Sequence, residues 1–511
     1  MTTKQTVNCS ATTRPTSDCF FQTAPLSTSS RDHPDAAVPS QRGDTQIPDH
    51  NLTATSAASL PFRVFAAIFA VAVGLRWINL ALLGEPALNH LIEDAQLYWN
   101  GAQYWLDSGF FAVPGPSGYV AHTERTPFYF IFLLPFRWMS GDSVTSALIA
   151  QTLIDSGTCV VIARIGAMIG RATGIVAGFF AATWINLIIH SSLVLTDTLF
   201  VFFASLVLLF AAKYVDRGRI LDIGLAGFFC GIAIVTRPVA LFLPLAMAIA
   251  APLISRHRGR RWIPGVAGAL VMLTLAMLPA TPIIYRNLTQ FGTPQLTTQS
   301  GPFLLFWVAG IPKTLATGKR FGTVTAELNS KLSDRLEQLE NSGIKLNVFQ
   351  RSQQLVALAR DELKAMPVGT VLYGWFYGAG LNLAAPALLQ DQRVHALNQA
   401  SFHNAVGIGF VDRAANFLRN NDLTYVFWLG VGCVGAVIAL LLQAYGWAVL
   451  IRRMFWPAIF GSLWIVYFLL LNGPVGGPKY RLPLEPVLIL FQSVAIVELA
   501  SNLRRFSNRP R

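Results

Sequence analysis

The chain has 511 residues, of which 53% are hydrophobic and only 13% are charged. Soluble domains carry about twice that charged fraction, so the composition excludes an ordinary cytosolic enzyme, a secreted disulfide scaffold and a nucleic-acid-binding module. The net charge of +13 comes from basic residues that cluster between apolar stretches. That distribution is typical of membrane topology, and no nucleic-acid partner is expected.

The N-terminal residues 1–60 are rich in Ser, Thr and Pro and have no apolar core of their own. We expect them to form a disordered cytoplasmic tail. The first apolar run begins at Phe62 with no cleavable signal peptide before it, so it is expected to be an uncleaved anchor. Ten stretches are predicted to cross a bilayer, namely residues 62–83, 144–163, 172–190, 198–215, 221–235, 239–254, 262–284, 423–451, 455–472 and 482–500.

Short basic connectors set the predicted orientation. They lie at 164–171, 213–219, 256–261, 452–453 and 504–511. The positive-inside rule places them and both chain termini in the cytoplasm. The outer side then receives residues 84–143, 191–197, 236–238, 285–422 and 473–481. The apolar segments 128–139 and 368–389 fit this alternation as re-entrant or membrane-surface helices on the outer side.

The chain turns polar between 311 and 366. Leucines from Leu328 to Leu339 repeat at helical spacing, which predicts an amphipathic helix over 326–340, and a weaker pattern predicts another over 347–365. These helices form either a small cap on the membrane body or a surface that guides a lipid or acceptor. The predicted fold class is an all-α polytopic membrane protein with about 10–13 transmembrane helices, outer juxtamembrane helices and a small external helical insert.

Acidic residues stand at the start of two outer-side helices. Glu93 and Asp94 open a surface helix whose apolar residues repeat at helical spacing. A carboxylate at the edge of hydrocarbon is partly desolvated, which would raise its pKa and suit it to act as a general base. The alternative is a solvated acid at a helix N-terminus. Asp197 opens the fourth span, where it either caps the helix or faces a cleft.

Basic and aromatic residues gather on the same side. The cations are Arg125, Arg237, Arg286, Lys479 and Arg481. Singly each would be a snorkelling anchor, but together they suit the binding of a lipid-linked phosphate at headgroup depth. Tyr98, Tyr129 and His122 are candidate contacts to a sugar or an acceptor.

Two charges, Arg76 and Asp155, fall inside predicted spans. They form either a buried structural pair or the pathway of a polytopic transporter or lipid flippase, which is the alternative function. His90, His122 and His190 lack ligand spacing, and no metal or cofactor is expected.

Several short motifs follow one another in a familiar order. They are Asp94-Ala95-Gln96-Leu97-Tyr98, Arg125-Thr126-Pro127-Phe128-Tyr129, Leu195-Thr196-Asp197, Thr236-Arg237-Pro238, Tyr285-Arg286-Asn287 and Tyr480-Arg481. In this the chain resembles the GT-C glycosyltransferases that use polyprenyl-phosphate sugars, in the protein-mannosyltransferase and aminoarabinose-transferase group. Ala95 stands where that family carries a second acid, and Glu93 lies one residue early.

The resemblance implies an enzyme of the inner (plasma) membrane with its active site on the outer, periplasmic face. The likeness covers residues 62 to about 300 well and the end of the chain moderately, whereas 311–422 matches no known family. The predicted domains are a catalytic core over 61–300 with a first outer loop 84–143, an external region over 301–422 with amphipathic helices and a re-entrant or surface segment, and C-terminal transmembrane helices over 423–511. A sugar would pass from a polyprenyl-phosphate donor to a lipid, glycan or protein acceptor of the envelope, with inversion. Asp94 would be the general base, with Asp197 and Glu93 as further catalytic acids. The phosphate would bind near Arg286 and Arg481, assisted by Arg237, Lys479 and Arg125.

Overall fold

The computed structural model describes residues 60–507 except 89–90, 92–93 and 398–401, and all of these belong to one unit, Thr55–Arg511. The tail predicted to be disordered, 1–60, lies outside the described residues apart from Leu60. Among the described residues, eight helices are long and apolar enough to cross a membrane, and a bent helix pair makes up to nine. The chain is a multi-pass, all-α membrane protein.

Each of the ten predicted spans coincides with a long helix or helix pair. These are α1 (Phe62–Leu88), α4 (Thr145–Ile169), α5 (Arg171–Thr183) with α6 (Ile185–Ser191), α7 (Asp197–Arg217), α8 (Ile220–Thr236), α9 (Leu243–His257), α10 (Trp262–Met277) with α11 (Thr281–Phe291), α19 (Leu423–Arg453), α20 (Phe455–Asn472) and α22 (Glu485–Ser507). The predicted span 172–190 is bent by 48° between α5 and α6. α8, with 17 residues, is an apolar helix of less than spanning length.

Shorter elements occupy the connections. They are α2 (Asp94–Ser108), β1 (Ala112–Gly115), β2 (Gly118–Ala121), α3 (Phe128–Ser140), α12 (Ser300–Pro302), the π-turn η3 (Phe303–Ala309), α13 (Gly310–Thr317), α14 (Phe321–Asn341), α15 (Val348–Ala365), α16 (Val368–Ala384), α17 (Gln392–His395), α18 (Gly409–Arg419) and α21 (Pro478–Arg481). The 3-10 turns are η1 (Pro238–Ala240), η2 (Leu278–Ala280), η4 (Ala387–Gln390), η5 (Phe402–Asn404) and η6 (Leu482–Leu484).

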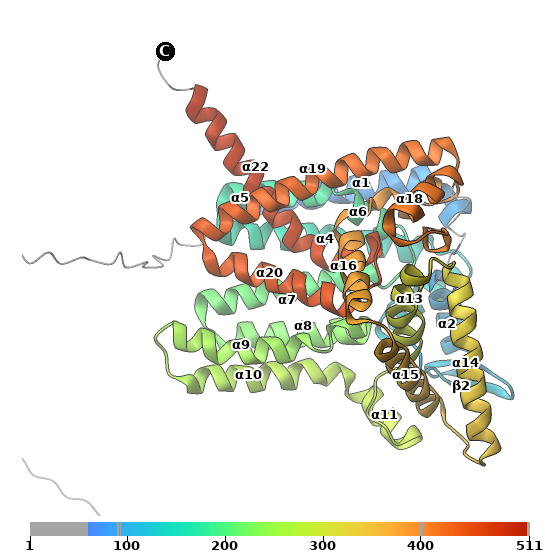
Figure 1. Ribbon diagram of the computed structural model, residues 1–511. Helices are drawn as coiled ribbons and strands as arrows, with labels where there is room; N and C mark the ends of the chain where they lie inside the picture. The colour runs from blue at the N-terminus through green and yellow to red at the C-terminus, as the bar shows by residue number, and fades with distance from the viewer. Residues whose placement is uncertain (1–59, 89–90, 92–93, 398–401, 508–511) are drawn as a thin grey trace, which may run out of the picture. The chain divides into compact units, whose positions relative to one another are not determined.

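The long helices lie side by side, and the short helices α2, α11, α13, α14, α15 and α18 gather at one end of them (Figure 1). At that end β1 and β2 form an antiparallel hairpin in which Val113 pairs with Val120. Sequence patterning did not predict this hairpin, because its two strands have only four residues each and lack alternation.

Small residues allow the long helices to approach closely. A Cβ at Gly446 of α19 would overlap the carbonyl oxygen of Phe491 in α22, and one at Gly227 of α8 would lie 2.6 Å from the Met272 carbonyl in α10. Apolar side chains gain little from leaving lipid, so close backbone packing supplies much of the contact energy between such helices. The first contact joins α22 to α19, and the second joins α8 to α10.

The predicted amphipathic helices of the insert are confirmed as α14 and α15. Val324 and Leu328 of α14 and Ala359 of α15 are buried against Leu305 of the π-turn in a small core of their own. This end of the molecule is tied further by Arg413 of α18, which is buried and donates to two backbone carbonyls of the α13–α14 region. Whether the insert also guides a lipid stays a prediction.

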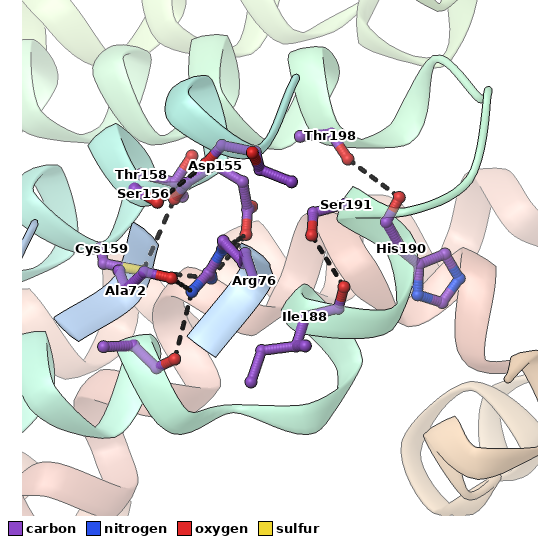
Figure 2. A network of polar contacts seen from close by, with 12 residues as sticks. Ala72, Arg76, Asp155, Ser156, Thr158, Cys159, Ile188, His190, Ser191 and Thr198 are labelled. Atoms are coloured by element: carbon purple, nitrogen blue, oxygen red, sulfur yellow. Dashed lines mark hydrogen bonds and ion pairs between the residues drawn. The ribbon is translucent and has the colours of Figure 1, made fainter. Parts of the chain in front are cut away.

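Arg76 and Asp155 form a closed ion pair inside the helix bundle (Figure 2). Nε and Nη2 of Arg76 lie 2.6 Å and 2.5 Å from Oδ2 of Asp155, and both side chains are buried. Nη1 donates to the carbonyls of Ala72 and Ala182, each at 3.1 Å, and Nη2 also contacts Cys159. Because Ala182 lies in the last turn of α5, the guanidinium satisfies a carbonyl near the break between α5 and α6. The geometry favours the structural interpretation of this pair over a transport pathway.

Breaking one side of this pair is expected to destabilise the protein strongly. Arg76→Met leaves the Asp155 carboxylate buried without its cation, which costs about 3–5 kcal/mol, whereas the double variant Arg76→Met/Asp155→Leu removes both charges and restores most of that loss. Thermal unfolding in detergent measures the three proteins. A double variant no more stable than Arg76→Met would contradict a purely structural role.

Candidate active site

The carboxylate of Asp94 lies between two cations from distant parts of the chain. Its Oδ1 accepts from Nη2 of Arg125 at 3.2 Å, and its Oδ2 accepts from Nζ of Lys479 at 3.2 Å. Asp94 begins α2, Arg125 precedes α3 and Lys479 belongs to α21. The Asp94 side chain is 38% exposed, against 14% for each cation. The carboxylate is therefore the accessible member of the group, and the two cations are set into the protein.

Backbone hydrogen bonds hold the loop that carries Arg125. The hydroxyl of the adjacent Thr126 donates to the Thr236 carbonyl at the end of α8, at 3.1 Å. The amide of Thr298 donates to the Thr123 carbonyl at 2.8 Å. The chain segment leading into the external insert thus braces the loop, so that Arg125 is positioned by elements on both sides of it.

A buried amide fixes the turn before Lys479. Asn382 of α16 donates to the Val475 carbonyl at 3.0 Å and accepts from the Gly477 amide at 3.1 Å. Gly477 has a φ of 153°, which a residue with a side chain adopts only with strain. α16 therefore places Lys479 even though it contributes no charge itself.

A second ion pair stands beside the first. Asp197, the buried first residue of α7, is contacted through Oδ1 by Nη1 of Arg237, and Arg237 also lies over the Phe200 ring at 5.8 Å. The other carboxylate oxygen of Asp197 is buried and has no hydrogen-bond partner among the described residues. Lys479 interacts electrostatically with both Asp197 and Asp94. We call these five residues, Asp94, Arg125, Asp197, Arg237 and Lys479, the Asp94 cluster.

The two cations change the acidity of Asp94. Burial raises the pKa of this carboxyl, but the charges of Lys479 and Arg125 outweigh burial and hold its pKa below the usual range. The prediction of a raised pKa is therefore wrong, because desolvation acts here together with two cations. Asp94 is ionised at neutral pH. Its pairing stabilises the fold above the ordinary carboxyl pKa, and that contribution is lost as the pH falls through the lowered pKa.

Arg286 lies against the backbone of His122. Its Nη2 donates to the His122 carbonyl and to Oδ1 of Asn287, each at 2.9 Å, while Nη1 is buried without a partner among the described residues. The imidazole stacks on Phe111 with ring centroids 4.7 Å apart. Burial, together with the charges of Arg125 and Arg286, lowers the pKa of His122 to about 4. The imidazole is therefore neutral at pH 7, and its predicted contact with a sugar or acceptor stays a prediction.

The two tyrosines predicted to contact sugar differ in their surroundings. Tyr98 of α2 interacts electrostatically with Arg125 and Lys479, so it adjoins the Asp94 cluster. Tyr129 packs edge-on against Tyr98, with ring centroids 5.2 Å apart. It is fully buried and donates its hydroxyl to Oε1 of Gln151 at 2.8 Å. The structure thus places Tyr98 next to the charges and Tyr129 behind it.

The side chain of Arg481 contacts other groups of the same chain. Its Nη1 donates to the Leu383 carbonyl at 2.8 Å. Its Nε lies 3.0 Å from Oε1 of Glu485, one helical turn away, in an ion pair that lacks hydrogen-bond geometry. Nη2 is buried without a hydrogen-bond partner among the described residues. The i, i+4 spacing to Glu485 was a signal for this pair in the sequence. A phosphate-binding role for Arg481 stays a prediction.

His190 joins the polar group although sequence analysis gave it no role. Its Nδ1 lies 2.9 Å from the Asn186 carbonyl, and its Nε2 is buried without a partner among the described residues. The ring interacts electrostatically with Asp197 and Lys479. Figure 2 shows the ring apart from the Arg76 network. The polar residues that follow His190 interrupt an apolar span, which was the available signal.

Two further predictions stay untested at this site. Glu93 lies outside the described residues. Among the residues that the structure describes, no three His, Cys, Asp or Glu side chains group as metal ligands. The expectation of a metal-independent reaction remains a prediction.

Comparison with known proteins finds a family match for part of the chain. Residues 124–285 match the family model described as Dolichyl-phosphate-mannose-protein mannosyltransferase. The match covers about a third of the chain and makes this part similar to that mannosyltransferase family. The matched part contains Arg125, Asp197 and Arg237, but neither Asp94 nor Lys479. No curated protein matches the chain.

Solved structures of two other proteins align with this chain at low identity. One is the archaeal oligosaccharyltransferase AglB from Archaeoglobus fulgidus, in complex with an inhibitory peptide and a dolichol-phosphate, at 12% identity and a TM-score of 0.49, covering 87% of this chain and 51% of AglB. The other is ArnT from Cupriavidus metallidurans bound to undecaprenyl phosphate, at 16% identity and a TM-score of 0.39, covering 87% of this chain and 80% of ArnT. The chain thus spans about half the length of AglB.

Removing one cation is expected to raise the pKa of Asp94. Lys479→Met deletes the largest of the charge effects that lower it, so the carboxyl should protonate at a higher pH than in the unaltered protein. Infrared titration of the carboxyl band, assigned by its loss in Asp94→Asn, measures this. Lys345→Met, at an exposed loop position, serves as the control and should leave the band in place. An unchanged titration in Lys479→Met would show that this ion pair is absent in the membrane.

Proposed function

We propose that this protein is a GT-C glycosyltransferase, which transfers a sugar from a polyprenyl-phosphate donor to a hydroxyl-bearing acceptor of the cell envelope. The observation that carries the proposal is the Asp94 cluster, in which a partly exposed carboxylate stands among three cations at one end of the helix bundle. The family match at 124–285 supports the same reaction class. The acceptor is a lipid, a glycan or a protein.

The cations of the cluster are proposed to bind the donor phosphate. Arg125, Lys479 and Arg237 are held by carboxylates, so they would meet a phosphate without large side-chain rearrangement. Guanidinium groups bind phosphate through paired hydrogen bonds, and an ammonium adds a point charge. Arg286, whose Nη1 is uncommitted, and Arg481 are proposed to extend this site.

The transfer itself is proposed as one in-line displacement. Asp94 takes the proton of the acceptor hydroxyl while the acceptor oxygen bonds to the anomeric carbon. The bond from that carbon to the phosphate oxygen breaks, and the electron pair leaves with the polyprenyl phosphate. The cations stabilise the charge that develops on this leaving group, and attack from the opposite side inverts the anomeric centre. Asp197 and Glu93 are proposed as supporting acids, and Tyr98, Tyr129 and His122 as sugar or acceptor contacts.

The lowered pKa of Asp94 bears on its role as a base. With Lys479 and Arg125 beside it, the carboxylate is ionised but only weakly basic. A donor phosphate that engages these two cations would neutralise much of their effect on the carboxylate and raise its pKa. The base would then become stronger once the donor is bound.

The cluster is proposed to face the outer side of the inner membrane, with both termini in the cytoplasm. The loop between α9 and α10, which carries a run of arginines, lies at the end of the helices opposite to α2 and α14 (Figure 1). By the positive-inside rule that loop is cytoplasmic, so the Asp94 end is external.

Replacing the proposed base should remove the chemistry without removing the protein. Asp94→Asn is expected to lower the rate of sugar transfer by about 10²–10⁴-fold, the usual contribution of a general base. The matched control is Asp107→Asn on the same helix, where the carboxylate is exposed and accepts hydrogen bonds from Gln103 and Tyr119. Transfer is measured in proteoliposomes with a radiolabelled polyprenyl-phosphate sugar. Near-normal transfer by Asp94→Asn would remove Asp94 from the catalytic role.

Replacing a phosphate-binding cation should act mainly on donor affinity. Arg125→Gln is expected to raise the KM for the donor by about 10–100-fold, with a smaller effect on kcat, because one charged hydrogen bond to phosphate is lost. Arg335→Gln, which breaks an exposed ion pair on α14, is the control and should change neither constant. A fall in kcat at constant KM would argue against ground-state phosphate binding by Arg125.

The donor sugar and the acceptor are best sought in cells. Mass spectrometry of envelope lipids and glycans, with and without the protein, should reveal one missing sugar, and the Asp94→Asn variant should reproduce the loss. An envelope with unchanged sugars but altered lipid distribution between leaflets would instead favour a flippase.

A further inference from the structure

The opposite end of the helix bundle carries a dense basic surface that the proposed reaction does not use. Two connectors meet there, one between α7 and α8 and one between α9 and α10. Their arginines are Arg217, Arg219, Arg256, Arg258, Arg260 and Arg261. Figure 1 shows the α9–α10 connection at the end of the long helices away from α2 and α14.

Two of these arginines tie the connectors together. Arg260 donates from Nη1 to the Gly218 carbonyl at 3.1 Å, and Arg258 donates to the Val215 carbonyl. Val215 and Gly218 lie at the C-terminal end of α7, where helical carbonyls lack partners and a cation is favourable. The positions of Arg258 and Arg260 are therefore explained by their hydrogen bonds to the end of α7.

Three other arginines of the two connectors make no such contacts with the end of α7. Arg219, Arg256 and Arg261 are exposed, and no hydrogen bond or ion pair of their side chains occurs within the described residues. Arg256 and Arg261 line a surface hollow of about 450 Å³, together with Gly259, Arg260, Trp262 and Ile263. Holding several uncompensated cations side by side is unfavourable unless an anion or solvent neutralises them.

The composition of the hollow indicates what kind of anion fits. Trp262 and Ile263 begin α10, a membrane-crossing helix, and are 50% and 72% exposed. A Trp at the start of a span marks the headgroup level of the bilayer. The hollow thus has cationic groups on its aqueous side and apolar groups on its membrane side, which complements a lipid rather than a free ion.

The first turn of α20 lies beside the α9–α10 connector. His257 contacts Trp456 edge-on with ring centroids 5.0 Å apart. Trp456 follows the basic pair Arg452 and Arg453 in the chain, and Arg453 is paired with Glu498 at 2.6 Å.

We propose that this hollow binds an anionic phospholipid of the cytoplasmic leaflet. Its phosphodiester would lie between Arg256 and Arg261, and its acyl chains would follow Trp262 and Ile263 along α10. Such a lipid would lie on the α9–α10 connector, at a place remote from the Asp94 cluster. The site is independent of the proposed transfer reaction, so either proposal can fail without the other.

The test uses the full-length protein in detergent micelles. Native mass spectrometry measures retained phosphatidylglycerol, and thermal unfolding measures stabilisation by phosphatidylglycerol, phosphatidylcholine or inorganic phosphate at equal concentration. Phosphatidylglycerol should be retained and should raise the unfolding temperature more than the other two. Arg256→Gln/Arg261→Gln should weaken its binding by about 30-fold, the fold-change for two basic groups of about 1 kcal/mol each.

The matched control removes the same charge elsewhere. Arg504→Gln/Arg505→Gln alters two exposed arginines at the end of α22 and should leave phosphatidylglycerol retention unchanged. Because the substituted side chains in both double variants are exposed, each should elute as the unaltered protein does in size-exclusion chromatography. Equal losses in the two double variants, or equal stabilisation by inorganic phosphate or phosphatidylcholine, would overturn the proposal.

Discussion

The ion pairs of Asp94 join segments that are 31 and 385 residues apart in the chain. A carboxylate that is partly withdrawn from water needs cationic partners, and Arg125 and Lys479 supply them from two different loops. Their positions depend in turn on side-chain hydrogen bonds to backbone carbonyls, from Thr126 to α8 and from Asn382 to the turn before α21. The packing of the helix bundle therefore sets the distances between Asp94 and its two cations.

Two groups of charges in this protein differ in their exposure to solvent. The Arg76–Asp155 pair is closed, since its side chains are 0% and 2% exposed and the guanidinium is also bound to backbone carbonyls. The Asp94 group is open, with a carboxylate that solvent reaches and cations set behind it. A closed pair stabilises packing and has no surface for a ligand, whereas an open one leaves its carboxylate accessible to a ligand.

Local patterns predicted much of the architecture. Each predicted span coincides with a helix or helix pair, because a run of apolar residues long enough for the bilayer has few alternatives to a helix. The amphipathic helices α14 and α15 also followed from leucine spacing. The β1–β2 hairpin was missed because its strands are short, and the pKa of Asp94 was predicted with the wrong sign because its cationic neighbours are remote in sequence.

The sequence by itself determined the helical membrane-embedded class of this protein and the supply of acidic and basic residues near helix ends. Only the tertiary structure decided which of them meet. It pairs Lys479 with Asp94, Arg237 with Asp197, and Arg481 with Glu485, although all three cations had been candidates for phosphate binding. The physical reason is that an ion pair forms only where the folded chain brings two opposite charges into contact, and sequence spacing does not encode that contact for segments that are distant in the chain.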